Sequence, residues 1–171
     1  MMRIGLLSDT HGWLDPAIRK HIDGCDELWH AGDIGTGEVT DELKRWKPLR
    51  AVYGNIDGTA LRQEFPEHQR FTIEQVRVWM THIGGTPPRY NPDVLPGLKA
   101  DPPTVFICGH SHICKVQFDP TLNTLYMNPG AAGRHGWHQV RTLLRFTIVG
   151  ASLKDLEVIE LGKRSASLPE G

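Results

Sequence analysis

The first third of the chain alternates between short apolar runs and amphipathic segments, and this order constrains the fold more than any other feature. Apolar runs at 3–9, 27–33 and 49–55 predict strands, and the segments between them, 15–23 and 37–47, predict helices. Strands that are joined through a helix run parallel in one sheet. The β-α-β-α-β order therefore predicts a parallel sheet covered by helices.

Closely spaced strands follow after residue 68. Residues 70–82 predict a hairpin, and 104–109 predicts another short buried strand. Four further runs predict consecutive antiparallel strands: 115–119, 124–128, 140–149 and 156–161. The Pro- and Gly-rich segment 84–103 predicts an exposed loop with one helical turn. Parallel units followed by a meander predict an α/β sandwich of two packed sheets.

Length and composition indicate one soluble domain. The 171 residues are 39% hydrophobic and 23% charged, which is typical of globular proteins. Because no linker or repeat divides the chain, we expect a single domain over 1–162 and a flexible tail over 163–171.

Charge, hydropathy and cysteine content disfavour several classes of partner. The formal net charge of −1 provides no positive field for a polyanion, so we expect no stable nucleic-acid binding. No apolar run reaches the length of a membrane span, and the first residues do not resemble a signal peptide. The three cysteines lack a disulfide pattern. We therefore expect a cytoplasmic protein without membrane association, and a homo-oligomer is left open.

A residue of metal-ligand type follows several of the predicted strands. These residues are Asp9, His11, Asp33, Asn55, His82, His110 and His112. In open α/β sheets, ligands bind outside the carboxyl ends of the strands, so we expect these side chains to converge there. Each short motif alone is weak evidence, and a lone His82 would more often be a core histidine. All of them together, in this order, favour a shared site.

The mixed set of oxygen and nitrogen ligands predicts two transition-metal ions. A structural zinc site would use thiolates, and a Ca or Mg site would use fewer imidazoles. One octahedral ion takes at most six ligands, whereas seven ligand residues are present, so we expect two divalent ions with one shared carboxylate. Mn²⁺ is the first expectation, and Ni, Fe or Zn are the alternatives. Two ions about 3.5–4 Å apart form a common clamp for displacement at phosphorus.

The motif series SDTHG, AGDIG, GNID, THIGG and GHSH resembles that of the calcineurin-like metallophosphoesterases. The resemblance extends from Ile4 to Gly130, including NPG at 128–130, and is nearest to the small single-domain YfcE-like phosphodiesterases of bacteria and archaea. It implies an α/β fold, a four-layer α-β-β-α sandwich of two mixed β-sheets flanked by helices. It also implies a dinuclear metal site at the C-terminal ends of the strands.

The resemblance implies a role for each ligand residue. The first ion would be held by Asp9, His11 and His112, the second by Asn55, His82 and His110, with Asp33 bridging both. Four of these residues are also the expected catalytic residues: Asp33, Asn55, His82 and His110.

One position departs from the family pattern. Many family phosphatases have a histidine directly after the Asn of the third motif, where it stabilises the transition state or protonates the leaving group, and here this residue is Ile56. The YfcE-like branch often lacks this histidine too. Without an obvious acid, diesters with good leaving groups should be preferred. Asp57 is either a hydrogen-bonding residue behind the ligands or a turn residue before Gly58.

Other polar residues have open roles. Arg134 and His135, after the NPG turn, either contact the substrate phosphate or replace the missing acid, or they belong to an exposed loop without a role. His30 either packs in the core or donates a hydrogen bond beneath the site.

Two functions are compatible with these features. The first is a metal-dependent phosphoesterase that hydrolyses small phosphodiesters, and some monoesters, through a metal-bridging hydroxide in an open site. The second is a protein-interaction scaffold on the same fold with little or no catalysis, as in a eukaryotic retromer subunit that resembles this branch and has part of its metal site altered. A scaffold predicts missing ligands and an exposed apolar patch. The intact set of seven ligands favours the enzyme.

Overall fold

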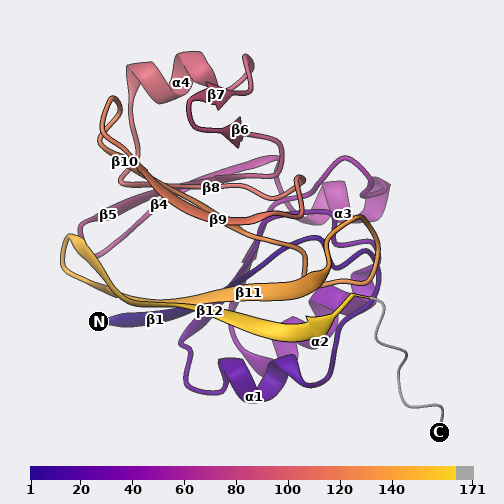
Figure 1. The fold of residues 1–171 in the computed structure, drawn as a ribbon. Helices are drawn as coiled ribbons and strands as arrows, with labels where there is room; N and C mark the ends of the chain where they lie inside the picture. Colours follow the sequence, from indigo (N-terminus) through magenta and orange to yellow (C-terminus); the bar gives the residue numbers. More distant parts are fainter. Residues whose placement is uncertain (165–171) are drawn as a thin grey trace, which may run out of the picture.

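Two five-stranded mixed sheets pack face to face in the computed structural model, which describes residues 1–164 (Figure 1). The first sheet has the order β12-β11-β1-β2-β3. Its parallel part is β1, β2 and β3, and its antiparallel part is β11 and β12. The bounds are β1 (Met2–Leu7), β2 (Glu27–His30), β3 (Leu49–Ala51), β11 (Val140–Val149) and β12 (Ser152–Lys163).

The second sheet has the order β4-β5-β8-β10-β9, with parallel strands in its centre and an antiparallel strand at each edge. The bounds are β4 (His68–Ile73), β5 (Val76–Thr81), β8 (Val105–Ile107), β9 (Cys114–Asp119) and β10 (Thr124–Pro129). A two-stranded ribbon, β6 (Gly85–Thr86) and β7 (Arg89–Tyr90), precedes β8 along the chain.

Helices cover the outer face of each sheet, which confirms the four-layer α-β-β-α order (Figure 1). The first sheet packs against α1 (Ile18–Ile22), α2 (Gly37–Trp46) and α3 (Thr59–Glu64). The second sheet packs against α4 (Leu95–Ala100). Alternation along β1 explains the arrangement, because Ile4 and Leu6 face the second sheet while Leu7 faces the helices.

Several predicted elements differ from the structure at their ends. Helix α1 begins at Ile18, because Asp15 accepts a hydrogen bond from the Ala17 N–H at 2.9 Å and forms a turn before it. Strand β12 continues to Lys163, the first residue of the predicted tail, and residues 165–171 of that tail lie outside the described residues. The predicted loop 84–103 contains the β6–β7 ribbon and α4. Helix α3 is absent from the prediction.

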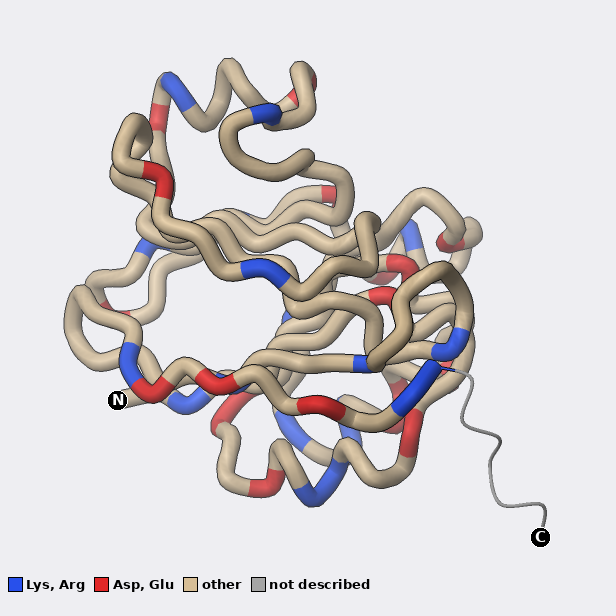
Figure 2. Tube along the Cα trace, in the orientation of Figure 1, with Lys and Arg blue, Asp and Glu red and all other residues tan. Residues whose placement is uncertain are grey.

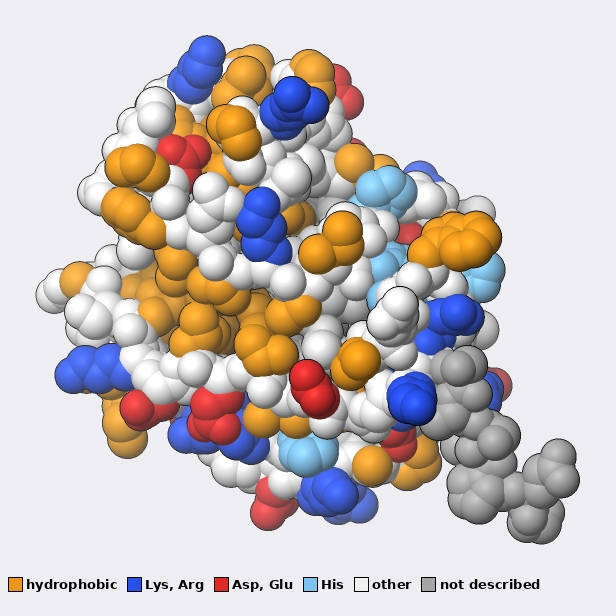
Figure 3. Space-filling view, viewed as in Figure 1, with side chains coloured by type: hydrophobic (Ala, Val, Ile, Leu, Met, Phe, Trp, Pro, Cys, Tyr) orange, Lys and Arg blue, Asp and Glu red, His pale blue; other side chains and the backbone are white. Residues whose placement is uncertain are grey.

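Charged and apolar side chains are distributed unevenly over the surface. Lys and Arg are interspersed with Asp and Glu along the chain, and neither sign gathers in one region (Figure 2). Hydrophobic side chains gather in the hollow between the two sheets (Figure 3). Two large apolar side chains of the edge strands, Phe118 of β9 and Val158 of β12, are each 53% exposed. Within residues 1–164, no helix combines the length and the apolar character needed to cross a membrane.

Candidate metal centre

Loops that follow five strands meet at one site. The strands are β1, β2, β3, β5 and β8, and the side chains that come together are those predicted from the sequence: Asp9, His11, Asp33, Asn55, His82, His110 and His112. Backbone hydrogen bonds join the first two loops, since the Asp9 N–H donates to the Gly32 carbonyl at 3.0 Å. Convergence therefore follows from the parallel order of neighbouring strands.

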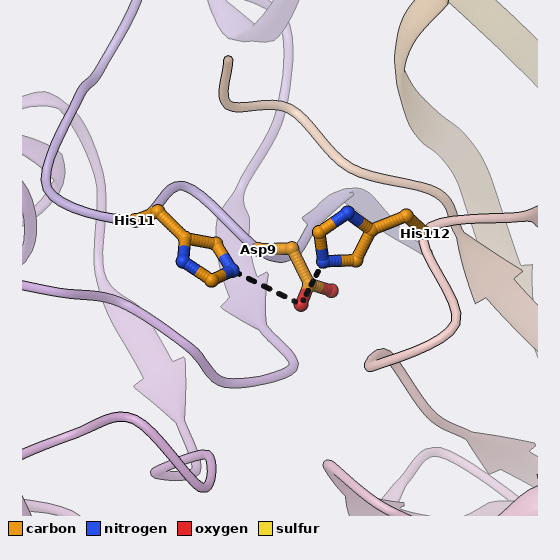
Figure 4. A group of neighbouring side chains, drawn as sticks. All are labelled: Asp9, His11 and His112. Carbon is orange, nitrogen blue, oxygen red and sulfur yellow. Dashed lines mark ion pairs between the residues drawn. The ribbon is translucent and has the colours of Figure 1, made fainter. Parts of the chain in front are cut away.

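The first ligand group consists of Asp9, His11 and His112, whose ligand atoms lie within 4.8 Å of one another (Figure 4). Nε2 of His112 lies 3.1 Å from Oδ1 of Asp9, and Nε2 of His11 lies 3.8 Å from the same oxygen. The other oxygen, Oδ2, accepts hydrogen bonds from the Ser8 hydroxyl at 2.6 Å and the His110 N–H at 3.1 Å. Nε2 of His82 also lies 3.8 Å from Oδ1, so the protein binds one oxygen of Asp9 and leaves the other facing three imidazoles.

The second ligand group consists of Asp33, His82 and His110, also within 4.8 Å of one another. Oδ1 of Asp33 accepts a hydrogen bond from the Ile56 N–H at 3.1 Å. Oδ2 lies 3.2 Å from Nε2 of His82 and 3.5 Å from Nε2 of His11. This single oxygen therefore lies between imidazoles of both groups, as a bridging ligand would.

Electrostatics keep both carboxylates ionised. Burial alone would raise the pKa of Asp9, but the adjacent imidazoles of His11 and His112 hold this pKa far below its ordinary value. Burial also opposes ionisation of Asp33, and the neighbouring His82 lowers the pKa of Asp33 nonetheless. Burial would lower the pKa of His82, but the adjacent Asp33 carboxylate raises it. Two buried negative charges therefore face the histidines, and a cation would neutralise them.

Three buried polar atoms of this site have no hydrogen-bond partner among the described residues: Oδ1 of Asp9, Nε2 of His11 and Nε2 of His82. Buried polar groups of folded proteins are nearly always paired. Carboxylate oxygen and imidazole nitrogen are ligands for divalent transition metals, so bound ions would supply the missing partners. Asn55 adds an amide oxygen 3.1 Å from Nδ1 of His110. The residues present therefore fit divalent metal ions.

Tight turns carry the ligands. Five ligand residues have positive φ, an uncommon conformation for residues other than glycine: Asp9 (55°), His11 (48°), Asp33 (54°), His110 (71°) and His112 (62°). Glycines allow the backbone to approach the carboxylates. A Cβ on Gly54 would lie 2.1 Å from Oδ1 of Asp33, and a Cβ on Gly109 would lie 2.8 Å from Oδ2 of Asp9.

Asp57 ties two ligand loops together. Its buried carboxylate accepts hydrogen bonds from the N–H groups of Ile34 at 3.1 Å, Gly35 at 2.8 Å and Gly54 at 2.8 Å. These donors follow Asp33 and precede Asn55 in the sequence. Of the two readings of Asp57, the structure supports hydrogen bonding behind the ligands, although its partners are backbone amides and no imidazole.

His30 lies fully buried beneath the site, where it both packs and donates a hydrogen bond. Its Nδ1 accepts a hydrogen bond from the Gly32 N–H at 3.1 Å, so its proton is on Nε2, which donates to the Thr10 hydroxyl at 3.0 Å. That hydroxyl donates in turn to the Ile34 carbonyl at 2.9 Å. Burial lowers the pKa of His30 to about 4, so this imidazole is neutral.

Hydrogen bonds on the far side of two imidazoles leave their Nε2 atoms free. Nδ1 of His82 donates to the Ala31 carbonyl at 2.7 Å. His138 donates through Nε2 to the Gly133 carbonyl at 2.8 Å, so its Nδ1 accepts from Nδ1 of His112 at 3.3 Å. Partners of this kind fix the tautomer of a metal-binding histidine. The sequence assigns His138 no role, and its place in the GRHGWHQ loop is the only signal.

Asn128 of the NPG segment is a second residue whose role the sequence does not reveal. Its buried side-chain amide donates to the Gly109 carbonyl at 2.9 Å and to the Ser111 hydroxyl at 3.1 Å. Its oxygen accepts from the Gly130 N–H at 2.9 Å. Asn128 thus holds the turn that carries His110.

Of the two predicted substrate residues, His135 lines the cleft over the ligands and Arg134 does not. The His135 ring stacks on His11, with centroids 4.7 Å apart, and it lines a cleft of about 310 Å³ over the ligands. The Arg134 guanidinium instead lies 4.1 Å from the centroid of Trp13 and does not line this cleft. A second cleft of about 320 Å³ adjoins the first at Asn55.

The model of the calcineurin-like phosphoesterase superfamily domain matches residues 2–151. The chain belongs to this superfamily. This membership confirms the family expected from the five motifs. It supports a phosphoesterase function in general, and the two ligand groups support divalent metals as cofactors.

Proteins similar to this chain differ in the functions that their names state. A probable metallophosphoesterase of Methanocaldococcus jannaschii is 30% identical over 76% of this chain and 68% of its own length. An archaeal phosphodiesterase shares the fold with a TM-score of 0.71 at 24% identity, over 94% of this chain and all of that one. Entamoeba histolytica Vps29 in complex with Zn²⁺ does so with a TM-score of 0.72 at 16% identity, over 93% and 99% of the two chains.

Proposed function

We propose that this chain hydrolyses small phosphodiesters, and some monoesters, with two divalent ions held by its seven ligand residues. The observation that carries the proposal is the position of Asp33, whose Oδ2 lies 3.2 Å from Nε2 of His82 and 3.5 Å from Nε2 of His11. A bridging carboxylate between two ligand groups is the arrangement that a two-metal phosphoesterase needs.

Each ligand group would hold one ion. Three residues would bind the first ion, three the second and one would bridge: Asp9, His11 and His112; Asn55, His82 and His110; and Asp33. Mn²⁺ is our first choice, with Ni, Fe and Zn as alternatives. Bound ions supply Lewis acidity that activates solvent and neutralises charge on the phosphoryl oxygens.

The surrounding residues would set the substrate range. Ile56 offers no proton to a leaving group, so esters with good leaving groups should react fastest. His135 is the nearest further candidate for a substrate contact, because it stacks on His11 and lines the cleft. Interspersed charges of both signs (Figure 2) support a small substrate and disfavour a nucleic acid. A cytoplasmic location remains a prediction.

A scaffold function is the second candidate. The apolar hollow between β9 and β12 (Figure 3) is a surface of the kind that a protein partner would cover. Vps29 chains share the fold. The complete ligand set, with its unpartnered buried atoms, favours the enzyme.

Hydrolysis of bis(p-nitrophenyl) phosphate tests the enzyme reading. We expect turnover by protein loaded with Mn²⁺, loss on chelation and recovery when Mn²⁺ returns. Asp33→Asn should lose turnover, whereas Asp23→Asn, at an exposed position remote from the ligands, should not. Metal analysis should find two ions per chain. Turnover that survives chelator and Asp33→Asn would refute the proposal, and a stoichiometric protein partner without turnover would favour the scaffold.

A further inference from the structure

Two apolar side chains line the metal cleft in contact with solvent. Ile56 is 47% exposed and Trp137 is 98% exposed, and the same cleft contains the ligands His11, Asp33 and His112. Large exposed apolar side chains that gather around a pocket mark a binding surface. Here the polar floor and the apolar rim belong to one cleft, so one ligand must satisfy both.

The position of Ile56 is fixed by the second ligand group. Its N–H donates to Oδ1 of Asp33 at 3.1 Å, and its neighbours Asn55 and Asp57 are both held. Arg62 adds a further tie by donating to the Asn55 carbonyl at 3.2 Å. Ile56 therefore presents its side chain from a rigid turn next to the reacting centre.

Residues on both sides hold Trp137 at the first ligand group. His135 stacks on His11, and Nδ1 of His138 lies 3.3 Å from Nδ1 of His112. A Cβ on Gly136 would lie 2.2 Å from Nδ1 of His112, so the backbone just before Trp137 is in close contact with this ligand. The indole is thus placed beside the site by its neighbours, although it packs against little of the protein.

Cleft chemistry restricts the ligand. The metal ligands of the floor select an anionic phosphate, through the ions that they fit. At the rim, Ile56 offers neither charge nor side-chain hydrogen bonds. Trp137 offers a broad aromatic face. An inorganic phosphate or a small hydrated ester would leave this rim in water. A phosphodiester that carries an aromatic or a bulky alkyl group would cover it and release the water.

We propose that Ile56 and Trp137 select phosphodiesters whose organic group next to the phosphate is aromatic or a bulky alkyl group, and discriminate against a methyl group. This inference rests on the proposed phosphodiesterase function and gives its substrate class. It also gives Ile56 a role, since an apolar contact stands where many family members have a histidine. Discrimination between a phenyl and a methyl group by such a rim is expected to be about ten- to a hundred-fold.

Two diesters with the same leaving group test the inference: phenyl p-nitrophenyl phosphate and methyl p-nitrophenyl phosphate. The measurement is the ratio of their kcat/KM values in wild type, Trp137→Ala and Ile56→Ser. Any intrinsic difference in reactivity cancels when these ratios are compared. We expect the phenyl preference to fall about ten-fold in each variant, mainly through KM of the phenyl ester. The control is Phe118→Ala, which removes an aromatic side chain that is 53% exposed and lies outside the cleft.

A binding measurement separates this inference from the chemistry. Calorimetry on Mn²⁺-loaded protein should show that diphenyl phosphate binds at least about ten-fold tighter than dimethyl phosphate, and that Trp137→Ala removes the difference. Equal ratios in wild type and variants, with turnover present, would overturn the inference and leave the proposed function intact. No turnover of either diester would overturn both. A change of oligomeric state in Trp137→Ala, seen by light scattering, would assign the rim to a protein interface and also overturn it.

Discussion

Removal of the Asp57 carboxylate should destabilise the metal-free protein and loosen the metal centre together. The carboxylate accepts three backbone hydrogen bonds, two of them from Ile34 and Gly54, inside buried structure. Hydrogen bonds to a charged group contribute about 1.5–3 kcal/mol each, and a buried donor without partner costs about 1–3 kcal/mol. Because water can reach part of the loop, we expect Asp57→Ala to lower the free energy of unfolding by about 3–5 kcal/mol.

Urea unfolding of chelated protein measures this loss, and calorimetry with Mn²⁺ measures metal affinity. Asp57→Asn keeps an acceptor but no charge, so its loss should be about half as large. Metal affinity should fall about 10- to 100-fold in both variants, because the loops of Asp33 and Asn55 lose their common tie. The exposed Asp23→Asn serves as control. If Asp57→Ala unfolds within about 0.5 kcal/mol of wild type, this reasoning is wrong.

Three further predictions concern residues around the ligands. His138→Ala should weaken Mn²⁺ binding about 10- to 100-fold. In ¹⁵N spectra of the metal-free protein, His112 should lose its Nδ1–H tautomer. His138→Gln can accept and donate hydrogen bonds, so it should restore much of the Mn²⁺ affinity and of this tautomer. Burial lowers the pKa of His30 from 6.5 to about 4, so the unfolded chain binds the proton more readily than the folded protein does. The free energy of unfolding should therefore decline by about 3 kcal/mol as the pH falls from above 6.5 to 4. His30→Gln should make this decline smaller. Ile56→His should raise turnover of alkyl esters relative to p-nitrophenyl esters, because imidazole can protonate a poor leaving group; an unchanged ratio would contradict this.

The metal ligands were predictable because residue type and strand order are both visible in the sequence. A carboxylate or imidazole after each parallel strand must reach the same edge of the sheet, whatever the loops do in detail. Asp33 illustrates this. Its place after β2 predicted that it joins the shared site, while its bridging role was implied by the family resemblance, and its Oδ2 lies between His11 and His82.

The residues that hold the ligands depend on loop paths, which residue types do not specify. Asp57 finds two of its three amide partners more than twenty positions earlier, in Ile34 and Gly35, and His138 meets His112 across a similar separation. Helix α3 was missed for a related reason. It is six residues long, and its stability comes from Leu61 in the core and from Arg62, which donates to the carbonyls of Asp57 and Asn55.

The cost of the ligand geometry weighs on the choice between enzyme and scaffold. Positive φ costs about 1–3 kcal/mol for each non-glycine residue, and five ligand residues carry it. Two carboxylates are buried beside imidazole atoms that have no partner among the described residues. Asp57, His30 and Asn128 offset these costs through hydrogen bonds to the ligand loops.

A surface used only to dock a protein gains nothing from this strain, since a neutral turn would be more stable. A site that must bind two cations gains preorganised ligands. Mn²⁺ should therefore raise the urea concentration at which wild type unfolds, and should leave that of the double variant Asp9→Asn/Asp33→Asn unchanged. If wild-type stability did not respond to Mn²⁺, the strain would be without function and the scaffold would gain support.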